Sequence, residues 1–169
     1  EGAYFVYFGG PVLNGIADGS VESGQNSGYL GNSVAGLGDV NGDGYADIGG
    51  GANGFDVNGT NGGRVSVCYG GAPFNTVVDV QLNGPGAGAR LGASLAAAGD
   101  VNGDGFGDVI VGANELSNGQ AIEGAAYVYF GGATLSTTAN GIIEENSVSS
   151  GLGASVAGVG DVNGDGYAD

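Results

Sequence analysis

The feature that most constrains this chain is an internal repeat with a period of 61 residues. Three independent markers keep this spacing without insertion: an acidic loop, an aromatic-Gly-Gly triplet, and a Leu-Gly pair followed two residues later by serine. Their starting positions are Asp39, Asp100 and Asp161; Phe8, Tyr69 and Phe130; and Leu30, Leu91 and Leu152. Such self-similarity predicts one supersecondary unit per repeat, each burying its core against its neighbours.

Each period contains segments that predict four β-strands. Residues 94–101 are small and apolar, residues 108–113 are rich in β-branched side chains, and residues 124–132 alternate Tyr and Val. A weaker fourth strand is expected near residues 77–82 in one repeat and 141–145 in the next. Helical spacing is not sustained anywhere. Four antiparallel strands per repeat are typical of a β-propeller blade, so the expected fold class is all-β.

The markers divide the chain into four parts of one propeller domain. Residues 1–29 are predicted to be the C-terminal half of one blade, 30–90 and 91–151 two full repeats, and 152–169 the start of a further repeat. Propellers usually close with about four to eight blades, so the chain is expected to be a segment of a larger propeller. A calcium-binding β-roll would need a nine-residue period, which is absent.

The negative net charge of the chain favours the binding of cations. Eighteen Asp and Glu stand against two Arg, with no Lys or His, and the formal net charge is −16. This balance argues against nucleic acid and against insertion into, or binding to, an anionic membrane. No run of about 18 apolar residues predicts a membrane span. Nine of the eighteen acids lie in the three loops, three per loop, which favours cation binding.

The loop pattern D-x-N-x-D-G-x-x-D predicts a metal site. Calcium takes six to eight oxygen ligands from carboxylates, amides and backbone carbonyls. Side chains at loop positions 1, 3, 5 and 9 and the backbone carbonyl at position 7 can supply them. The predicted ligands are Asp39, Asn41, Asp43, Tyr45 and Asp47; Asp100, Asn102, Asp104, Phe106 and Asp108; and Asp161, Asn163, Asp165, Tyr167 and Asp169.

Other ions and other loops fit this pattern less well. A helical EF-hand would need Glu at loop position 12, where this chain has Gly50 or Val111. Magnesium prefers fewer protein ligands, and zinc or copper would need His or more than one Cys. We therefore expect three structural Ca²⁺ ions, one clamping each hairpin. No residue set for nucleophilic catalysis is present, so the chain is not expected to be an enzyme; Cys68 is interpreted as a core residue.

These motifs resemble those of the FG-GAP repeat family, which includes the repeats of integrin α-subunit propellers and of many bacterial secreted proteins. The resemblance covers essentially the whole chain and rests on residues 67–73, 91–94, 100–113 and 127–133. It differs in having Leu for the usual Phe before the first strand, and in residues 48–53, where glycines are expected to weaken the second strand. The resemblance implies a propeller of about seven blades with calcium in its hairpin loops.

Three functions remain open from the sequence. The first is a calcium-stabilised extracellular propeller for adhesion, ligand recognition or surface assembly, at the cell surface or secreted. The second is a non-catalytic calcium-binding module of a larger secreted carbohydrate-active enzyme. The third is a structural repeat of a filament or surface layer. A protein or carbohydrate ligand fits these functions, as does assembly with further blades.

Overall fold

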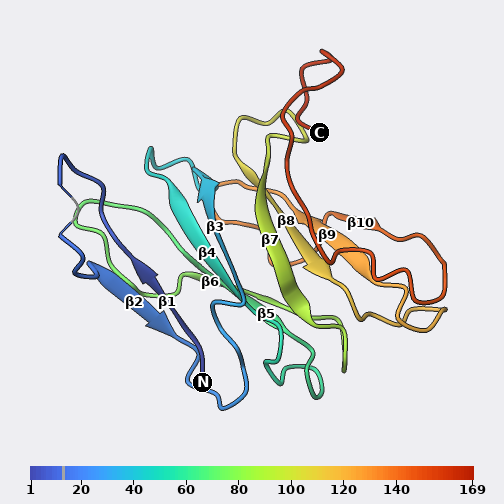
Figure 1. Ribbon diagram of the computed structural model, residues 1–169. Coiled ribbons are helices and arrows are strands. Elements are labelled where there is room, and N and C mark those ends of the chain that lie inside the picture. Colours follow the sequence, from blue (N-terminus) through green and yellow to red (C-terminus); the bar gives the residue numbers. More distant parts are fainter. Residues whose placement is uncertain (13) are drawn as a thin grey trace.

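The computed structural model describes residues 1–12 and 14–169 (Figure 1). These residues form ten β-strands and no helix, so they contain no helix that could span a membrane. The strands are β1 (Ala3–Val6), β2 (Gly19–Glu22), β3 (Ser33–Gly38), β4 (Asp47–Ala52), β5 (Arg64–Cys68), β6 (Val80–Asn83), β7 (Leu91–Gly99), β8 (Asp108–Ala113), β9 (Ala125–Tyr129) and β10 (Gly141–Ile143).

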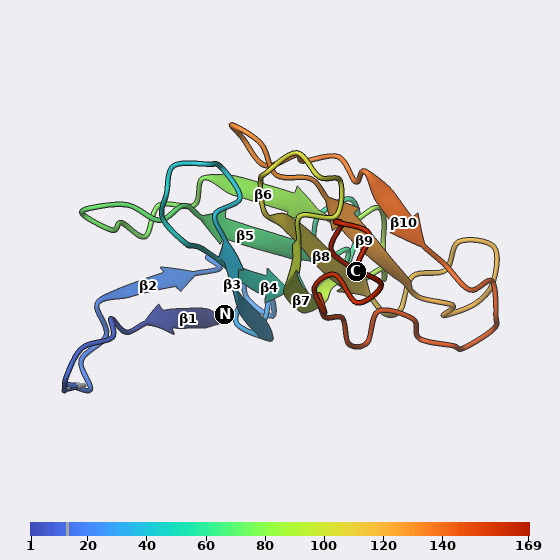
Figure 2. The same cartoon turned by 90° about the horizontal axis from the view of Figure 1, so that it is seen from above.

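The strands pair in chain order into three antiparallel sheets. One sheet has the order β3-β4-β5-β6, the next β7-β8-β9-β10, and the N-terminal strands form the pair β1-β2. Figure 2 shows the three sheets in succession, with β3 and β7 next to each other. The all-β class and the four-stranded antiparallel unit are confirmed.

The strand boundaries differ in part from those predicted. β8 coincides with the predicted range, whereas β7 starts three residues early because Leu91 pairs with Ala113. β7 also ends early, since Gly99 adopts a φ of 81° and turns the chain into the acidic loop. The fourth strands are shorter than predicted, at Val80–Asn83 and Gly141–Ile143.

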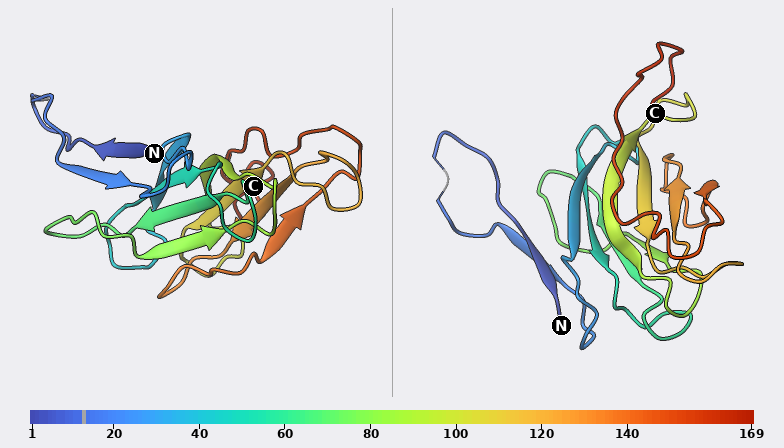
Figure 3. Two further views of the ribbon diagram at one scale, coloured as in Figure 1. Left: turned by 90° about the horizontal axis from the view of Figure 1, so that it is seen from below. Right: turned by 45° about the vertical axis from the view of Figure 1, so that its right-hand side comes forward.

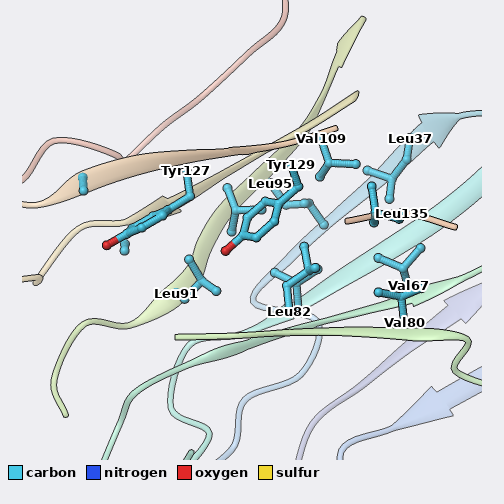
Figure 4. Close-up of a cluster of buried hydrophobic side chains, with 14 of the residues drawn as sticks. Leu37, Val67, Val80, Leu82, Leu91, Leu95, Val109, Tyr127, Tyr129 and Leu135 are labelled. Atoms are coloured by element: carbon cyan, nitrogen blue, oxygen red, sulfur yellow. The ribbon is translucent and has the colours of Figure 1, made fainter. Parts of the chain in front are cut away.

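Side-chain alternation divides the interior into two clusters. In β5, Val65 and Val67 face the second four-stranded sheet and join its core, while Cys68 faces β1 and β2. Figure 4 shows the larger cluster, to which the first four-stranded sheet contributes Leu82 and the second contributes Leu95. Cys68 is fully buried, and its Sγ lies 3.4 Å from the Tyr4 hydroxyl, which agrees with its interpretation as a core residue.

The glycines of β4 allow close packing and do not prevent strand formation. A Cβ at Gly51 would lie 2.2 Å from the carbonyl oxygen of Gly92, and one at Gly50 would lie 2.4 Å from the Tyr4 ring. β4 nevertheless pairs with both β3 and β5 along its length. The glycines therefore make room for a neighbouring ring at Gly50 and neighbouring backbone at Gly51, and the expected weakening of the strand stays a prediction.

The repeated serines join consecutive units. Ser33 Oγ donates to the carbonyl oxygen of Gly92 at 2.9 Å, and Ser94 Oγ donates to that of Gly153 at 2.7 Å. Each acceptor belongs to the Leu-Gly pair of the following repeat. The serine and the Leu-Gly pair of the same marker, taken from consecutive repeats, therefore contact each other across the boundary between units.

Replacing Ser94 by alanine should lower the free energy of unfolding by about 1 kcal/mol, because the Gly153 carbonyl loses its hydroxyl donor. Urea unfolding monitored by circular dichroism measures this difference. The matched control is Ser20→Ala on β2, where the side chain is exposed and the change should stay within about 0.5 kcal/mol. Equal losses in both variants would contradict the structural role of the hydroxyl.

The C-terminal segment does not form the predicted first strand. Leu152 makes one isolated parallel bridge to Gly124, and residues 154–169 contain no strand. The segment still runs along the second sheet (Figure 3, right), with Gly158 against the backbone of Ala97 and Ala98. In the other repeats the first strand pairs with the strand after the acidic loop.

Candidate metal centre

The three acidic loops lie at one end of the sheets, the upper end in Figure 1. The first aspartate closes each loop by accepting backbone N–H groups. Asp39 Oδ1 accepts from Gly42 at 2.6 Å and from Asp43 at 3.1 Å, and Asp39 Oδ2 accepts from Gly44 at 2.8 Å. The second and third loops have the same three hydrogen bonds. The shared sequence therefore produces one shared loop geometry.

The residues at positions 3 and 5 form side-chain turns within the loop. Asn41 Oδ1 accepts from Asp43 N at 3.0 Å, and Asp43 Oδ1 accepts from Tyr45 N at 2.9 Å. Asn41 Nδ2 donates to Asp43 Oδ2 at 2.9 Å. Both side chains are thereby fixed within the loop by turns of the kind that Asn and Asp favour.

The ninth residue carries the fully buried carboxylate of the first two loops. Asp47 is fully buried, with Oδ2 accepting from Val40 N at 2.8 Å and Oδ1 accepting from Gly70 N at 2.7 Å. Asp108 is equally buried and accepts from Val101 N and Gly131 N, both at 2.8 Å. The carboxylate thus ties the start of the loop to the end of the third strand.

Gly70 and Gly131 are functional residues that the ligand prediction missed. Both belong to the aromatic-Gly-Gly marker, whose strict spacing was visible in the sequence. A Cβ at Gly70 would lie 2.5 Å from the carbonyl oxygen of Ala46, and one at Gly131 would lie 2.3 Å from that of Gly107. Only glycine lets the backbone approach the loop closely enough to donate to the ninth aspartate.

Burial and like charge both act on the ninth aspartate. The pKa of Asp47 is raised above its ordinary value, mainly by burial, which disfavours the charged form. Amide bonds from Gly70 and Val40 oppose the rise, while the charges of Asp43 and Asp39 add to it. Asp108 has a raised pKa for the same causes. In the exposed third loop, the pKa of Asp161 is lowered, chiefly by the hydrogen bond from Gly166 N.

No positively charged side chain of this sequence neutralises the negative charge of the acidic loops. The chain has two such groups, Arg64 and Arg90. Arg64 stacks on Phe55 with its guanidinium carbon 4.0 Å from the ring centre, and Arg90 Nε lies 2.7 Å from Glu115 Oε2. Both arginines are therefore engaged away from the acidic loops.

Consecutive loops contact each other. Gly107 N donates to the carbonyl oxygen of Asp39 at 3.0 Å, and Ala168 N donates to that of Asp100 at 2.9 Å. The Phe106 ring covers Gly42 so closely that a Cβ there would lie 2.5 Å from Cε1. The aromatic at position 7, predicted only as a backbone ligand, therefore also packs against the preceding loop.

The third loop is held less completely than the other two. Asp169 Oδ2 accepts from Val162 N at 2.9 Å, as in the other loops, but both Asp161 and Asp169 are exposed. Its position 9 carboxylate has no bond equivalent to those from Gly70 and Gly131 among the described residues.

The donor set suits a hard cation. Positions 1, 3, 5, 7 and 9 supply only oxygen atoms, and the loop charge is not balanced by the chain itself. In the described part of the chain, no three Asp, Glu, Cys or His side chains converge into a cluster that could hold a metal ion. The carboxylates accept hydrogen bonds from backbone amides instead, and the oxygens that accept a single bond, such as both oxygens of Asp47, retain a lone pair for a further partner.

Successive four-stranded antiparallel sheets, each with an acidic hairpin loop at the same end, define this chain as a set of β-propeller blades. Residues 30–68 and 91–129 each match the family model of the FG-GAP repeat. The chain is also 36% identical over 155 residues to integrin alpha-V of Gallus gallus, a match that covers 86% of this chain and 15% of that protein.

The chain therefore belongs to the FG-GAP repeat family, as the sequence motifs predict, and it is similar to an integrin α subunit. The two matched ranges begin at Leu30 and Leu91, the same Leu-Gly marker that opens each predicted repeat. Since the chain spans only 15% of its relative, the activity and partners of a whole protein are matters of proposal.

Proposed function

We propose that this chain is part of an extracellular β-propeller that calcium stabilises and that serves adhesion, ligand recognition or surface assembly. One observation carries the calcium proposal: Asp47 and Asp108 are fully buried carboxylates, repelled by other loop aspartates, and no cationic side chain balances them. A divalent cation would turn this repulsion into attraction.

The three loops would each hold one ion. In the first loop the ligands would be Asp39, Asn41, Asp43 and Asp47 with the backbone carbonyl of Tyr45; the other loops would use the equivalent residues. Asp47 would hold the ion while keeping its bonds to Val40 and Gly70, so the ion would link the first, second and third strands. Calcium fits because it accepts many oxygen ligands in flexible geometry.

Calcium binding should be measurable by isothermal titration of the metal-free chain. We expect dissociation constants of about 10⁻⁴ to 10⁻³ M, the range of extracellular modules. The first two loops should bind more tightly than the third, whose ninth carboxylate is exposed. At one to ten times the dissociation constant, each site should add about 0.4–1.4 kcal/mol to the free energy of unfolding.

Matched variants assign this binding to the loops. Asp43→Asn and Asp104→Asn each remove one exposed loop charge and should weaken calcium binding at that loop about tenfold. Glu145→Gln removes an exposed charge outside the loops and should leave the titration unchanged. Absence of calcium binding by the metal-free chain, or loss of binding in Glu145→Gln alone, would refute the proposal.

The extracellular assignment rests on family membership. Repeats of the integrin α type build extracellular propeller modules, and they are generally non-catalytic. We infer a protein ligand, or assembly with further blades, from the similarity to integrin alpha-V. A carbohydrate ligand, a place within a larger secreted carbohydrate-active enzyme, and a structural role in a filament or surface layer remain alternative proposals. A binding screen against immobilised proteins and glycans would separate them.

A further inference from the structure

The chain contains ten Asn-Gly pairs, a dipeptide that can modify itself. In this reaction the backbone nitrogen of the glycine attacks the side-chain carbonyl carbon of the preceding asparagine. The attack requires that the glycine N–H lose its proton. A hydrogen bond from that N–H to a carboxylate opposes the step, because the bond stabilises the protonated amide. The hydrogen bonding of each glycine therefore distinguishes chemically identical pairs.

The three loop pairs are the best protected. The N–H groups of Gly42, Gly103 and Gly164 each donate to the first aspartate of their loop at 2.6 Å. Asparagine side chains in these loops are also held in turns with the aspartate at position 5. Both reacting groups are fixed in other contacts.

Five further pairs have their glycine or asparagine held by the fold. Gly54 N donates to the carbonyl of Gly28, Gly62 N to that of Gly59, and Gly84 N to that of Gly63. The pair Asn140-Gly141 joins the β9-β10 ladder, and Asn140 Oδ1 accepts from Phe130 N at 2.9 Å. In Asn14-Gly15, the Asn14 Oδ1 accepts from Ile16 N at 2.9 Å, which also holds that side chain.

Asn58-Gly59 and Asn118-Gly119 differ from the others. Both pairs are exposed, and neither Gly59 N nor Gly119 N donates a hydrogen bond within the described residues. The two glycines have φ values of 122° and 112° in turns outside the strands. Their amide nitrogens are therefore free to lose a proton to solvent. The Asn58 side chain is held on one side only, since its Nδ2 donates to the carbonyl oxygen of Gly84 at 2.9 Å.

Asn118 also makes two hydrogen bonds that support the surrounding structure. Its Nδ2 donates to Glu144 Oε1 at 2.9 Å, and its backbone N donates to Glu123 Oε1. Glu144 follows directly after β10, so this contact joins the loop between β8 and β9 to the outer edge of the sheet. A chemical change at Asn118 would be transmitted to that edge.

We propose that Asn118 is a site of spontaneous deamidation, with Asn58 as a second site, and that the loop asparagines are protected. Gly119 N loses its proton to water and forms a bond to Asn118 Cγ. The Cγ–Nδ2 bond breaks, and ammonia leaves with the proton, giving a cyclic imide. Water then opens either imide bond, producing aspartate or isoaspartate, so one water is consumed and one ammonia released.

The product at position 118 repels its former partner. The new carboxylate has no N–H to donate and faces Glu144, so an attractive contact becomes a repulsion between like charges. Isoaspartate additionally inserts a methylene group into the backbone of the turn. The modification therefore loosens the β10 edge while leaving the acidic loops intact.

Peptide mapping by mass spectrometry tests the assignment directly. The full 169-residue chain is incubated without calcium at mildly alkaline pH, and each Asn-Gly pair is followed over time. Residues 118 and 58 should convert first, and residues 41, 102 and 163 about ten- to a hundredfold more slowly, from the strength of a hydrogen bond to a charged group. Because calcium is absent, the outcome does not depend on the proposed calcium function.

Two controls make the result decisive. In the urea-unfolded chain the pairs should convert at similar rates, which shows that structure sets the order. Asn118→Asp should lower the urea midpoint, and adding Glu144→Gln should recover most of that loss. Conversion of the loop asparagines as fast as residue 118 in the folded chain would overturn the proposal. A lowered midpoint that Glu144→Gln does not recover would overturn the proposed effect on the sheet edge.

Discussion

Replacing Asp47 by alanine should destabilise the chain by about 2–5 kcal/mol even without calcium, because Val40 N and Gly70 N both lose their acceptor. The first of these donors is buried and the second partly buried, so water replaces the carboxylate poorly. Urea unfolding in the presence of a chelator measures this structural contribution. The same change at Asp108 should have a similar effect, because its bonds are equivalent.

Asp43→Ala is the matched control for Asp47→Ala. Asp43 belongs to the same loop and is also a proposed calcium ligand, but it is exposed. In chelator its replacement should cost less than about 1 kcal/mol. With calcium present, both variants should lose the stabilisation from their site. Equal destabilisation by the two variants in chelator would show that Asp47 does not anchor the strands through its buried hydrogen bonds.

Gly51→Ala should destabilise the chain by about 3 kcal/mol, since it forces backbone apart where two units meet. The added Cβ would lie 2.2 Å from the carbonyl oxygen of Gly92 and 2.4 Å from Ser33 Oγ. Neither neighbour can move freely, because the Ser33 hydroxyl donates to that same carbonyl. Urea unfolding provides the midpoint, and an unchanged slope would confirm that the denatured state is not altered.

Gly36→Ala supplies the comparison within the same sheet. Gly36 lies in β3, and a Cβ there would meet no atom within 4 Å. The alanine should be neutral or stabilise by up to about 1 kcal/mol, by restricting the unfolded chain. If Gly51→Ala proved as well tolerated as Gly36→Ala, the close approach of the two units at Gly92 would not exist in solution.

Much of the fold could be predicted from the repeat alone. The 61-residue period, the β-branched run at residues 108–113 and the alternating Tyr and Val at residues 124–132 predicted the two four-stranded sheets. The weak fourth strand was misplaced by up to three residues, because short edge strands are defined by pairing more than by composition. Residues 152–169, expected to start a further repeat, contain an isolated bridge at Leu152 and no strand, since a strand requires a hydrogen-bonded neighbour.

The local geometry of the acidic loops could be predicted from the sequence. Side chains at positions 1, 3, 5 and 9 alternate along the loop, and the hydrogen bonds of Asp39, Asn41 and Asp43 are local, spanning two to five residues. Such contacts follow from nearby sequence. Calcium occupancy stays a prediction, which titration of the metal-free chain would test.

The sequence by itself therefore determined the repeat, the β class, the acidic loops and the family, because each depends on residue type at short or fixed spacing. Only the tertiary structure shows which contacts the other repeated residues make. Gly70 N reaches Asp47 across 23 residues, Ser94 reaches Gly153 across 59, and Phe106 covers Gly42 in the preceding loop. Spacing shows that such residues recur, but their contacts arise only when separate strands and blades pack together.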